Sequence, residues 1–183
     1  MTSGHPVQVR LATVADAEGI AAVHIDAWRS AYQGIVPDTY LSRMDAGRRS
    51  TRWRESLSAA APMTTVVVAA AGEDIVGFGS CGPYRVTLDA DDAAGVGEVY
   101  ALYVAPAAWR QGLGSRLLAG VEAALRMNGS EARLWVLSAT PGARQFYEAR
   151  GWRLDGSTVD LDLDAPVPAV RYAKTVATGG AAL

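Results

Sequence analysis

The stretch PAAWRQGLGSRLL, residues 106–118, joins two apolar segments of different periodicity. Before it, EVYALYV (98–104) is rich in β-branched and aromatic residues, which favours a strand. After it, helical spacing connects five apolar residues, Leu113, Leu117, Leu118, Val121 and Leu125. Gly112 and Gly114 lie in the turn. A glycine-rich turn from a strand into a helix often binds phosphate, because the first N–H groups of the helix face outward.

The composition is that of an ordinary soluble globular protein. Of 183 residues, 50% are hydrophobic and 20% are charged, which suits one domain over 1–183 with 177–183 as a frayed end. A net charge of −2 gives no general attraction to nucleic acid or to an anionic membrane. Neither a signal core nor an apolar run of ~20 residues is evident, so we expect a cytoplasmic protein without membrane contact.

Cysteine and histidine are scarce. Cys81 is the single cysteine and lies in an apolar strand-like run, where a buried, inert thiol is expected. His5 and His24 are the only histidines, so zinc chemistry lacks its usual ligands and no metal is expected.

Periodicity and turn signals predict alternating strands and helices in one mixed sheet. Strands are expected at 7–13, 64–71, 75–81, 98–104, 132–138, within 152–163, and at 169–176. Helices are expected after a Thr13–Asp16 capping pair, at about 38–60 with an interruption near Gly47, after Gly112, and at 141–150. The segment 83–97, which contains Asp89, Asp91 and Asp92, is expected to be a long acidic surface loop.

The fold class is therefore α/β (α+β), with a mostly antiparallel central sheet and helices on both faces. The strand 98–104, the following helix and the strand 132–138 need a right-handed crossover, hence one parallel pair. Arginines at 48, 49, 52 and 54 are expected to form a solvated face of their helix rather than a binding patch.

The turn alone is equally compatible with a tight turn that binds nothing. A dinucleotide-binding turn needs a third glycine where Leu117 stands, and an acidic residue where the next strand ends at Ser138. A Walker loop is excluded because no G-K-[ST] sequence occurs.

Taken with the order of elements, the turn resembles that of the GNAT superfamily of acetyl-CoA-dependent N-acetyltransferases. The family pattern [QR]-x-x-G-x-[GA] is similar to WRQGLG (109–114), which departs from it at Trp109, with Arg110 beside it. PGARQFYEARGW (141–152) resembles the segment N-x-x-A-x-x-F-Y-x-x-x-G-F, with Thr140 at the position of the leading Asn.

The resemblance implies acetyl-CoA as co-substrate, with its pantetheine paired to the strand and its pyrophosphate at the turn. The implied coenzyme-binding residues are Leu102, Tyr103, Val104, Arg110, Gln111, Gly112, Leu113, Gly114, Ser115, Thr140 and Tyr147.

The resemblance also implies catalytic and substrate-binding residues. Tyr147 is expected to be the acid that protonates the leaving thiolate, and Glu98 is the candidate base, directly or through water. Alternatively, Tyr147 is a core aromatic and Glu98 a solvated strand residue. Trp28, Tyr32 and Tyr100 are candidate substrate-binding residues, although an aromatic stripe is more often core.

The expected function is N-acetyl transfer to a primary amine by direct transfer in a ternary complex. A non-catalytic acyl-CoA-binding regulatory module and a nucleotide-dependent oxidoreductase are the alternatives. The acceptor is left open among peptide N-termini, protein lysines, polyamines, aminoglycosides and amino acids, and the acidic loop is compatible with a cationic amine. The resemblance favours a monomer or homodimer.

Overall fold

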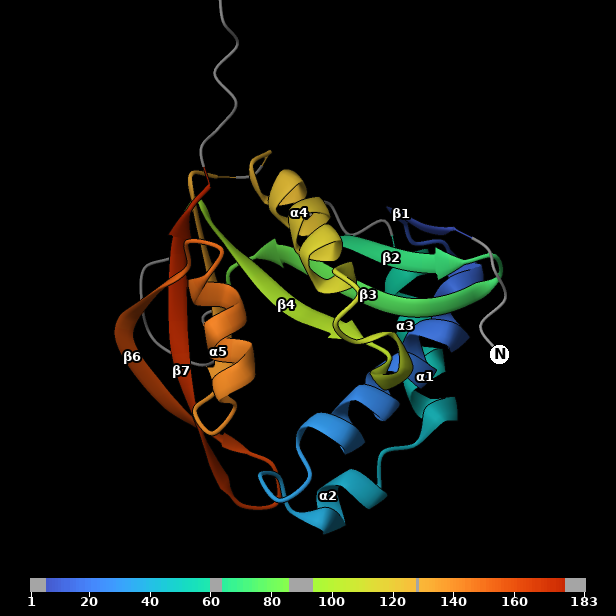
Figure 1. Cartoon of the computed structure of the whole chain (residues 1–183), viewed down its shortest axis with the longest axis horizontal. Coiled ribbons are helices and arrows are strands. Elements are labelled where there is room, and N and C mark those ends of the chain that lie inside the picture. The colour runs from blue at the N-terminus through green and yellow to red at the C-terminus, as the bar shows by residue number, and fades with distance from the viewer. Residues whose placement is uncertain (1–5, 60–63, 86–93, 128, 177–183) are drawn as a thin grey trace, which may run out of the picture.

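The computed structural model of the chain describes residues 6–59, 64–85, 94–127 and 129–176. A single twisted sheet runs through this part of the chain, with helices packed on both of its faces (Figure 1). The strands are β1 (Val7–Leu11), β2 (Thr65–Ala71), β3 (Asp74–Pro83), β4 (Val96–Val104), β5 (Glu131–Leu137), β6 (Arg153–Asp162) and β7 (Pro166–Thr175). The helices are α1 (Ala17–Ala31), α2 (Asp38–Ser42), α3 (Ala46–Ser58), α4 (Leu113–Leu125) and α5 (Pro141–Glu148), with 3₁₀ turns η1 (Val14–Asp16) and η2 (Pro106–Ala108).

The sheet has the order β1-β2-β3-β4-β5-β7-β6. Every neighbouring pair is antiparallel except β4 and β5, which are parallel and connected through α4. This confirms the predicted mixed sheet with one parallel pair.

Strand β2 shows why the sheet needs helices on both faces. Val67 and Ala69 belong to a core cluster with Leu117 and Val121 of α4. Their neighbours Val66 and Val68 face the other way, into a cluster with α1. Because successive side chains of a strand point to opposite faces, an uninterrupted apolar strand is stable only where both faces are covered. No helix in the described part of the chain is both long and apolar enough to cross a membrane.

Local sequence signals explain several element boundaries. The Thr13–Asp16 capping box is present, and Arg10 donates to both oxygens of Asp16 at 2.7 and 2.8 Å. The predicted interruption near Gly47 is confirmed and lies just before this residue: α2 ends at Ser42, and Asp45 caps α3 by accepting from the Arg48 N–H at 2.7 Å. A good N-cap outweighs the low helix propensity of one glycine, which lies in the first turn of α3.

The predicted loop 83–97 is shorter at both ends than expected, because β3 extends to Pro83 and β4 begins at Val96. Asp89, Asp91 and Asp92 lie outside the described residues, as does the predicted frayed end 177–183.

Glycines allow α4 to lie directly on β3. A Cβ at Gly79 would stand 2.8 Å from Cγ2 of Val121 on α4 and 3.1 Å from Cδ1 of Leu102. By contrast, a Cβ at Gly120, within α4, would meet only ordinary contacts at 3.6 Å or more. The absence of a side chain at Gly79 therefore sets the distance between helix and sheet, and with it the position of the turn before α4.

We expect Gly79→Ala to lower the free energy of unfolding by about 1 kcal/mol or more, because overpacking a tight core outweighs the gain in backbone rigidity. The control Gly120→Ala should raise it by about 0.5–1 kcal/mol, the usual gain at an exposed or roomy helix position. Urea unfolding of both variants measures this. Equal stability of the two variants would contradict the packing account.

Candidate active site

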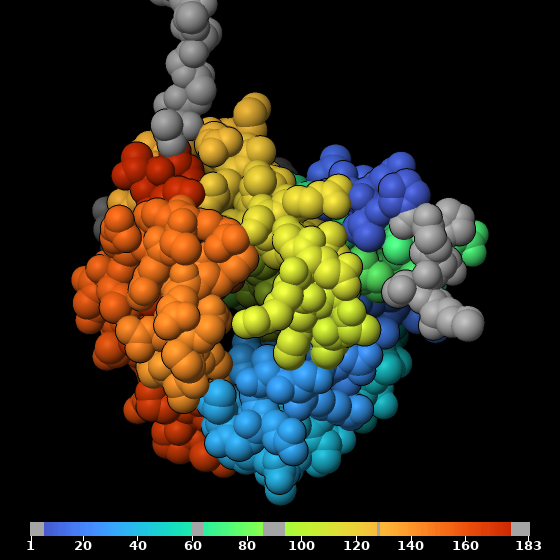
Figure 2. Space-filling model, viewed as in Figure 1, coloured from blue at the N-terminus to red at the C-terminus, as the bar shows by residue number. Residues whose placement is uncertain are grey.

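An opening between β4 and β5 is the centre of the site. The two strands pair only over Val96–Glu98 with Glu131–Arg133, and beyond these residues they diverge. Opposite Cys81 of β3, Tyr100 is the extra residue of a β-bulge, which bends β4 at this point. In Figure 2 the surface is hollowed between α5, in orange, and the segment that leads into α4, in yellow.

The backbone of β4 presents to this opening hydrogen-bonding groups that pair with no strand, although the Val104 carbonyl accepts from the Trp109 side chain. The N–H of Ala105 donates to Val76 on β3 at 2.9 Å. Because backbone groups alternate in direction along a strand, the amides of Leu102 and Val104 face away from β3 and into the opening. Tyr103 instead pairs through its backbone with β3. An unpaired strand edge of this kind binds an extended, amide-containing chain by adding it as a further strand.

The turn before α4 has the geometry that its glycine predicts. Gly112 is the N-cap residue in the left-handed region, with φ 77°, and Arg110 also has a positive φ of 62°. Leu113 and Gly114 are the first two residues of α4, so their N–H groups have no carbonyl within the helix. A Cβ at Gly112 would meet nothing within 4 Å, whereas one at Gly114 would lie 3.3 Å from the Phe146 ring. Gly112 thus shapes the turn and Gly114 lets α5 approach α4.

Trp109, which departs from the family pattern, closes this turn. Its indole Nε1 donates to the carbonyl oxygen of Val104 at 2.7 Å, so the side chain joins the turn to the last residue of β4. Gln111 donates to the Ala107 carbonyl at 3.3 Å. The side chain of Arg116 donates to Val7 on β1 at 2.8 Å and therefore lies at the sheet edge, not free beside the turn.

Arg150 is a cation near the turn that sequence reasoning missed. Its guanidinium donates to the Ser115 hydroxyl and lies 3.8 Å from the Phe146 ring centroid. A second nitrogen donates to the Phe146 carbonyl at 2.7 Å. The contact joins residues 35 positions apart, so no local pattern reveals it. It places positive charge beside the first turn of α4, where the helix dipole also favours an anion.

Helix α5 brings Tyr147 to the opening. Tyr147 packs among Phe146, Trp152 and Tyr172, and burial, with a contribution from the Tyr103 hydroxyl, raises the pKa of its own hydroxyl. The hydroxyl therefore keeps its proton at neutral pH. Thr140 is the N-cap residue of α5, and its hydroxyl donates to the Leu137 carbonyl at 2.7 Å.

An aromatic cluster from α1, α2 and β4 adjoins the opening. The hydroxyls of Tyr32 and Tyr103 are 3.4 Å apart, and Trp28 contacts Tyr32 edge-on with ring centroids 5.0 Å apart. Tyr40 stacks on Trp28 at 5.9 Å. The indole N–H of Trp28 is buried and lies beside the Tyr103 hydroxyl.

Glu98 and Tyr100 share a face of β4, as predicted, and Arg85 covers both. The side chain of Glu98 is 1% exposed, and its oxygens accept from Arg85 Nη2 at 2.6 Å, Nε at 3.1 Å and the backbone N–H at 2.9 Å. The same guanidinium lies 4.2 Å from the Tyr100 ring centroid. The Tyr100 hydroxyl donates to the Pro83 carbonyl at 2.5 Å, and burial raises its pKa to about 12. Glu98 is therefore an ion-paired, buried carboxylate and not a solvated one.

Comparison with known proteins agrees with this geometry. A sequence model of the Acetyltransferase (GNAT) family matches residues 26–152, more than half of the chain. The uncharacterized N-acetyltransferase YuaI of Bacillus subtilis (strain 168) is 34% identical over 145 residues, which cover 78% of each protein. The chain belongs to the GNAT family of acetyltransferases.

Solved structures share the fold of this GNAT enzyme. The PaiA N-acetyltransferase from Thermoplasma acidophilum, in complex with coenzyme A, has a TM-score of 0.68 at 19% identity and covers 91% of this chain and 98% of its own. The YncA structure from Salmonella typhimurium, with its cofactor acetyl-CoA, has a TM-score of 0.69 at 17% identity, covering 97% and 98%. Family membership makes the chain an acyltransferase.

The GNAT fold brings most of the predicted site residues together around the β4–β5 opening. Those on β4, the turn and α5 line it from three sides, and Trp28 and Tyr32 adjoin it through Tyr103. Tyr100 and Glu98 are the exceptions. The Tyr100 hydroxyl donates to Pro83 and its ring lies under Arg85, and Glu98 is buried in its ion pair with Arg85.

His24 lies under this aromatic cluster and is held uncharged. It stacks on Tyr103 with ring centroids 5.0 Å apart and contacts the Arg49 guanidinium at 3.1 Å. Burial, and secondarily the charge of Arg49, lowers the pKa of His24 from 6.5 to about 3. His24 is thus part of the packing beneath the site and a poor proton acceptor at neutral pH.

This buried histidine predicts an acid-sensitive fold. In the unfolded chain His24 binds a proton below about pH 6.5, whereas in the folded chain it binds one only below about pH 3. The free energy of unfolding therefore falls as the pH falls from about 6.5 to about 3. We expect the free energy of unfolding to fall by about 1 kcal/mol per pH unit between pH 6 and 4.5. Urea unfolding at constant ionic strength measures the slope, and His24→Gln should flatten it. An unchanged slope in that variant would contradict the assignment.

Proposed function

We propose that this GNAT enzyme transfers the acetyl group of acetyl-CoA to a primary amine, directly, within a ternary complex. The observation that carries the proposal is the unpaired edge of β4 next to the left-handed glycine turn at the start of α4. The unpaired edge of β4 suits a chain that contains amides, and the glycine turn suits a phosphate. Coenzyme A contains both an amide-bearing arm and a pyrophosphate. That the neighbours PaiA and YncA contain coenzyme A or acetyl-CoA supports the same choice.

The residues of this chain would hold the coenzyme in two places. The backbone amides of Leu102 and Val104 would pair with the pantetheine arm. The outward N–H groups after Gly112, with Arg110 and Arg150 nearby, would hold the pyrophosphate. The side chain of Gln111, the backbone of Leu113 and Gly114, the hydroxyls of Ser115 and Thr140, and the backbone of Tyr103 complete the proposed coenzyme-binding set.

Acetyl-CoA supplies a thioester whose carbonyl carbon accepts a nucleophile. The ammonium first loses one proton to give the neutral amine. A bond then forms between the amine nitrogen and this carbon, the carbon–sulfur bond breaks, and the nitrogen loses a second proton and keeps one as the amide N–H. A thiolate leaves and takes up a proton. The chain must therefore supply a donor for the sulfur, a route for the amine protons and a hydrogen-bond donor for the carbonyl oxygen.

Tyr147 is the proposed proton donor. Its raised pKa keeps the hydroxyl protonated until the thiolate develops. The Tyr32 and Tyr103 hydroxyls are close enough to influence its electrostatics, and the pKa of Tyr32 is raised well above its usual value by burial. The N–H of Leu102 is the proposed donor to the carbonyl oxygen.

Direct transfer is favoured over an acetyl-enzyme because the only cysteine is poorly placed as a nucleophile. Cys81 is buried, its Sγ donates to the Val121 carbonyl at 3.7 Å, and burial raises the thiol pKa to about 11. Since the thiolate is the nucleophilic form, this thiol is inert at neutral pH.

Tyr147→Phe should lower kcat about 10²-fold while the Kd for acetyl-CoA changes little, because only the proton donor is lost. The control Tyr172→Phe removes a neighbouring hydroxyl that binds Glu148 and Arg144 instead, and it should retain kcat. Free-thiol release over a panel of amines measures kcat, and calorimetry measures the Kd. Unchanged kcat in Tyr147→Phe would remove Tyr147 from the mechanism. Tight acetyl-CoA binding without thiol release over the whole panel would favour the regulatory module.

Glu98 is the proposed base, and it can act only if Arg85 yields one of its hydrogen bonds to the amine or to a bridging water. Glu98→Gln should then lower kcat about 10²-fold, whereas Arg85→Gln, which frees the carboxylate, should retain most of the turnover. Thiol-release kinetics of the two variants from pH 6 to 9 compare them. Equal losses in both would assign Glu98 and Arg85 a structural role as an ion pair.

A further inference from the structure

We propose that a cationic pocket at the α2–α3 connection binds an anionic group of the acceptor, so that the enzyme acts on amines that carry a carboxylate or a phosphate. The inference rests on the proposed acetyl transfer and adds the substrate class. It concerns the pocket that is lined by Tyr40, Arg43, Asp45, Arg48, Arg49 and Arg52, called the arginine pocket below.

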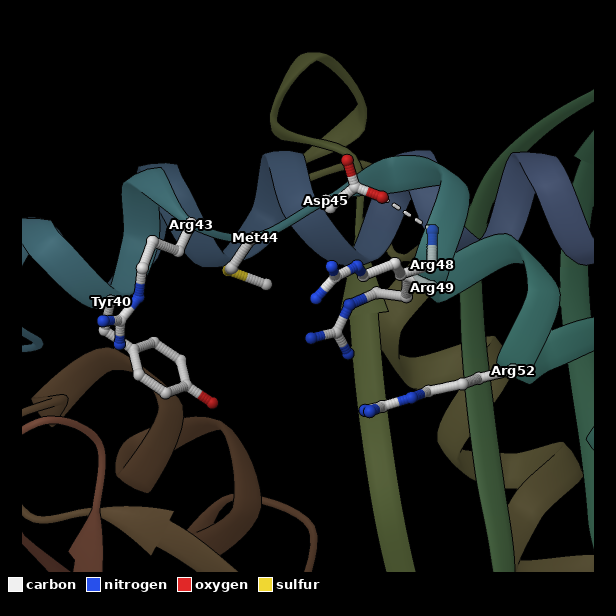
Figure 3. A pocket seen from close by; sticks show the side chains of 7 residues that line it. All are labelled: Tyr40, Arg43, Met44, Asp45, Arg48, Arg49 and Arg52. Atoms are coloured by element: carbon white, nitrogen blue, oxygen red, sulfur yellow. Dashed lines mark hydrogen bonds between the residues drawn. The ribbon is translucent and has the colours of Figure 1, made fainter.

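The arginine pocket is an open cavity of about 450 Å³. In Figure 3 the side chains of Arg48, Arg49 and Arg52 extend from α3 into a space that the Tyr40 ring enters from α2. This volume lies in the usual range for small-ligand sites.

The charges around the pocket are poorly balanced. Arg43 forms an ion pair with Asp164 on the turn between β6 and β7. Asp45 is the one carboxylate in the lining, and its Oδ1 accepts the Arg48 backbone N–H. Within the described residues, no carboxylate forms an ion pair with the guanidinium of Arg48, Arg49 or Arg52.

The Arg49 guanidinium is half-buried and faces the uncharged ring of His24, and burial lowers its pKa. Arg48 and Arg52 are exposed, but their side chains line the same cavity as Arg49. Three guanidiniums that line one cavity suit an anion, since each presents a planar fork that matches carboxylate or phosphate oxygens.

The arginine pocket is connected to the proposed transfer centre by aromatic contacts. Tyr40 lines the pocket and stacks on Trp28, Trp28 contacts Tyr32, and the Tyr32 hydroxyl lies 3.4 Å from that of Tyr103. An acceptor whose anionic group binds the arginines would lie along this wall with its amine toward the β4–β5 opening.

The first experiment compares matched amines as acceptors in free-thiol release with acetyl-CoA at constant ionic strength. 4-Aminobutyrate is paired with 4-aminobutyramide, and O-phosphoethanolamine with ethanolamine, so that only one member of each pair carries an anionic group. We expect kcat/KM for that member to exceed kcat/KM for its partner about tenfold or more in at least one pair. The pair that responds distinguishes carboxylate from phosphate. Turnover that favours the neutral or a cationic amine, such as putrescine, would overturn the inference and leave acetyl transfer standing.

The second experiment tests the pocket with variants. Arg52→Gln and Arg48→Gln change exposed side chains, and each should raise KM for the anionic amine about tenfold, because a charge-assisted hydrogen bond is lost. The Kd for acetyl-CoA should not change. Arg54→Gln is the matched control, since Arg54 lies on α3 outside the lining and contacts Ser50. Equal effects of Arg52→Gln and Arg54→Gln would refute a specific pocket.

Binding without turnover provides an independent readout. Calorimetric titration of the full chain with glutarate or inorganic phosphate should show binding that Arg52→Gln weakens and Arg54→Gln does not, with glutaramide as the neutral control. If neither anion binds and no anionic amine is acetylated, the inference is wrong. If acetyl-CoA itself does not bind, the proposed function fails instead.

Discussion

The structure depends on the brief pairing of β4 with β5. Three residue pairs hold the parallel strands together, after which the bulge at Tyr100 bends β4 away while β5 continues beside β7. The sheet is continuous in order yet open at its centre, and the opening exposes backbone amides that any ordinary sheet would pair internally. Because α4 follows β4 and α5 follows β5, the same divergence places a helix N-terminus and Tyr147 at the two sides of the opening.

Much of this arrangement is encoded locally and could be read from the sequence. The strand–turn–helix pattern around Gly112 predicts a residue in the left-handed region at the start of a helix, and Gly112 adopts this conformation as the N-cap of α4. The alternation of β2 between two core clusters likewise follows from an apolar strand that needs cover on both faces. Signals of this kind extend over a few residues, which is why element order was predictable and the positions of side chains in space were not.

The contacts that define the candidate site are mostly long-range. Arg85 binds Glu98 from across the β3–β4 connection, and Arg150 reaches Ser115 from another helix. Glu98 alone in the sequence was equally compatible with a base or a solvated residue. The ion pair with Arg85 shows that Glu98 is neither a free base nor a solvated residue, because a buried carboxylate is stable only when its charge is compensated. Trp109 is a similar case: a poor match to the family pattern has a structural explanation in its bond to Val104.

The arginines of α3 also show that a local sequence pattern does not reveal long-range contacts. The arginines of α3 have the spacing of a solvated helix face, and taken alone that interpretation was reasonable. Two features outside α3 change it. The break at Asp45 turns the helix so that its first turns face Tyr40 of α2, and buried His24 lies against Arg49 without supplying negative charge. The side chains of Arg48, Arg49 and Arg52 therefore line one open cavity, although Arg48 and Arg52 are exposed. In the two proposals, coenzyme binding and acceptor choice are separated in the fold. The first would rest on backbone geometry at β4 and α4, which tolerates varied side chains. The second would rest on the side-chain charge of α3, which can vary without disturbing the first.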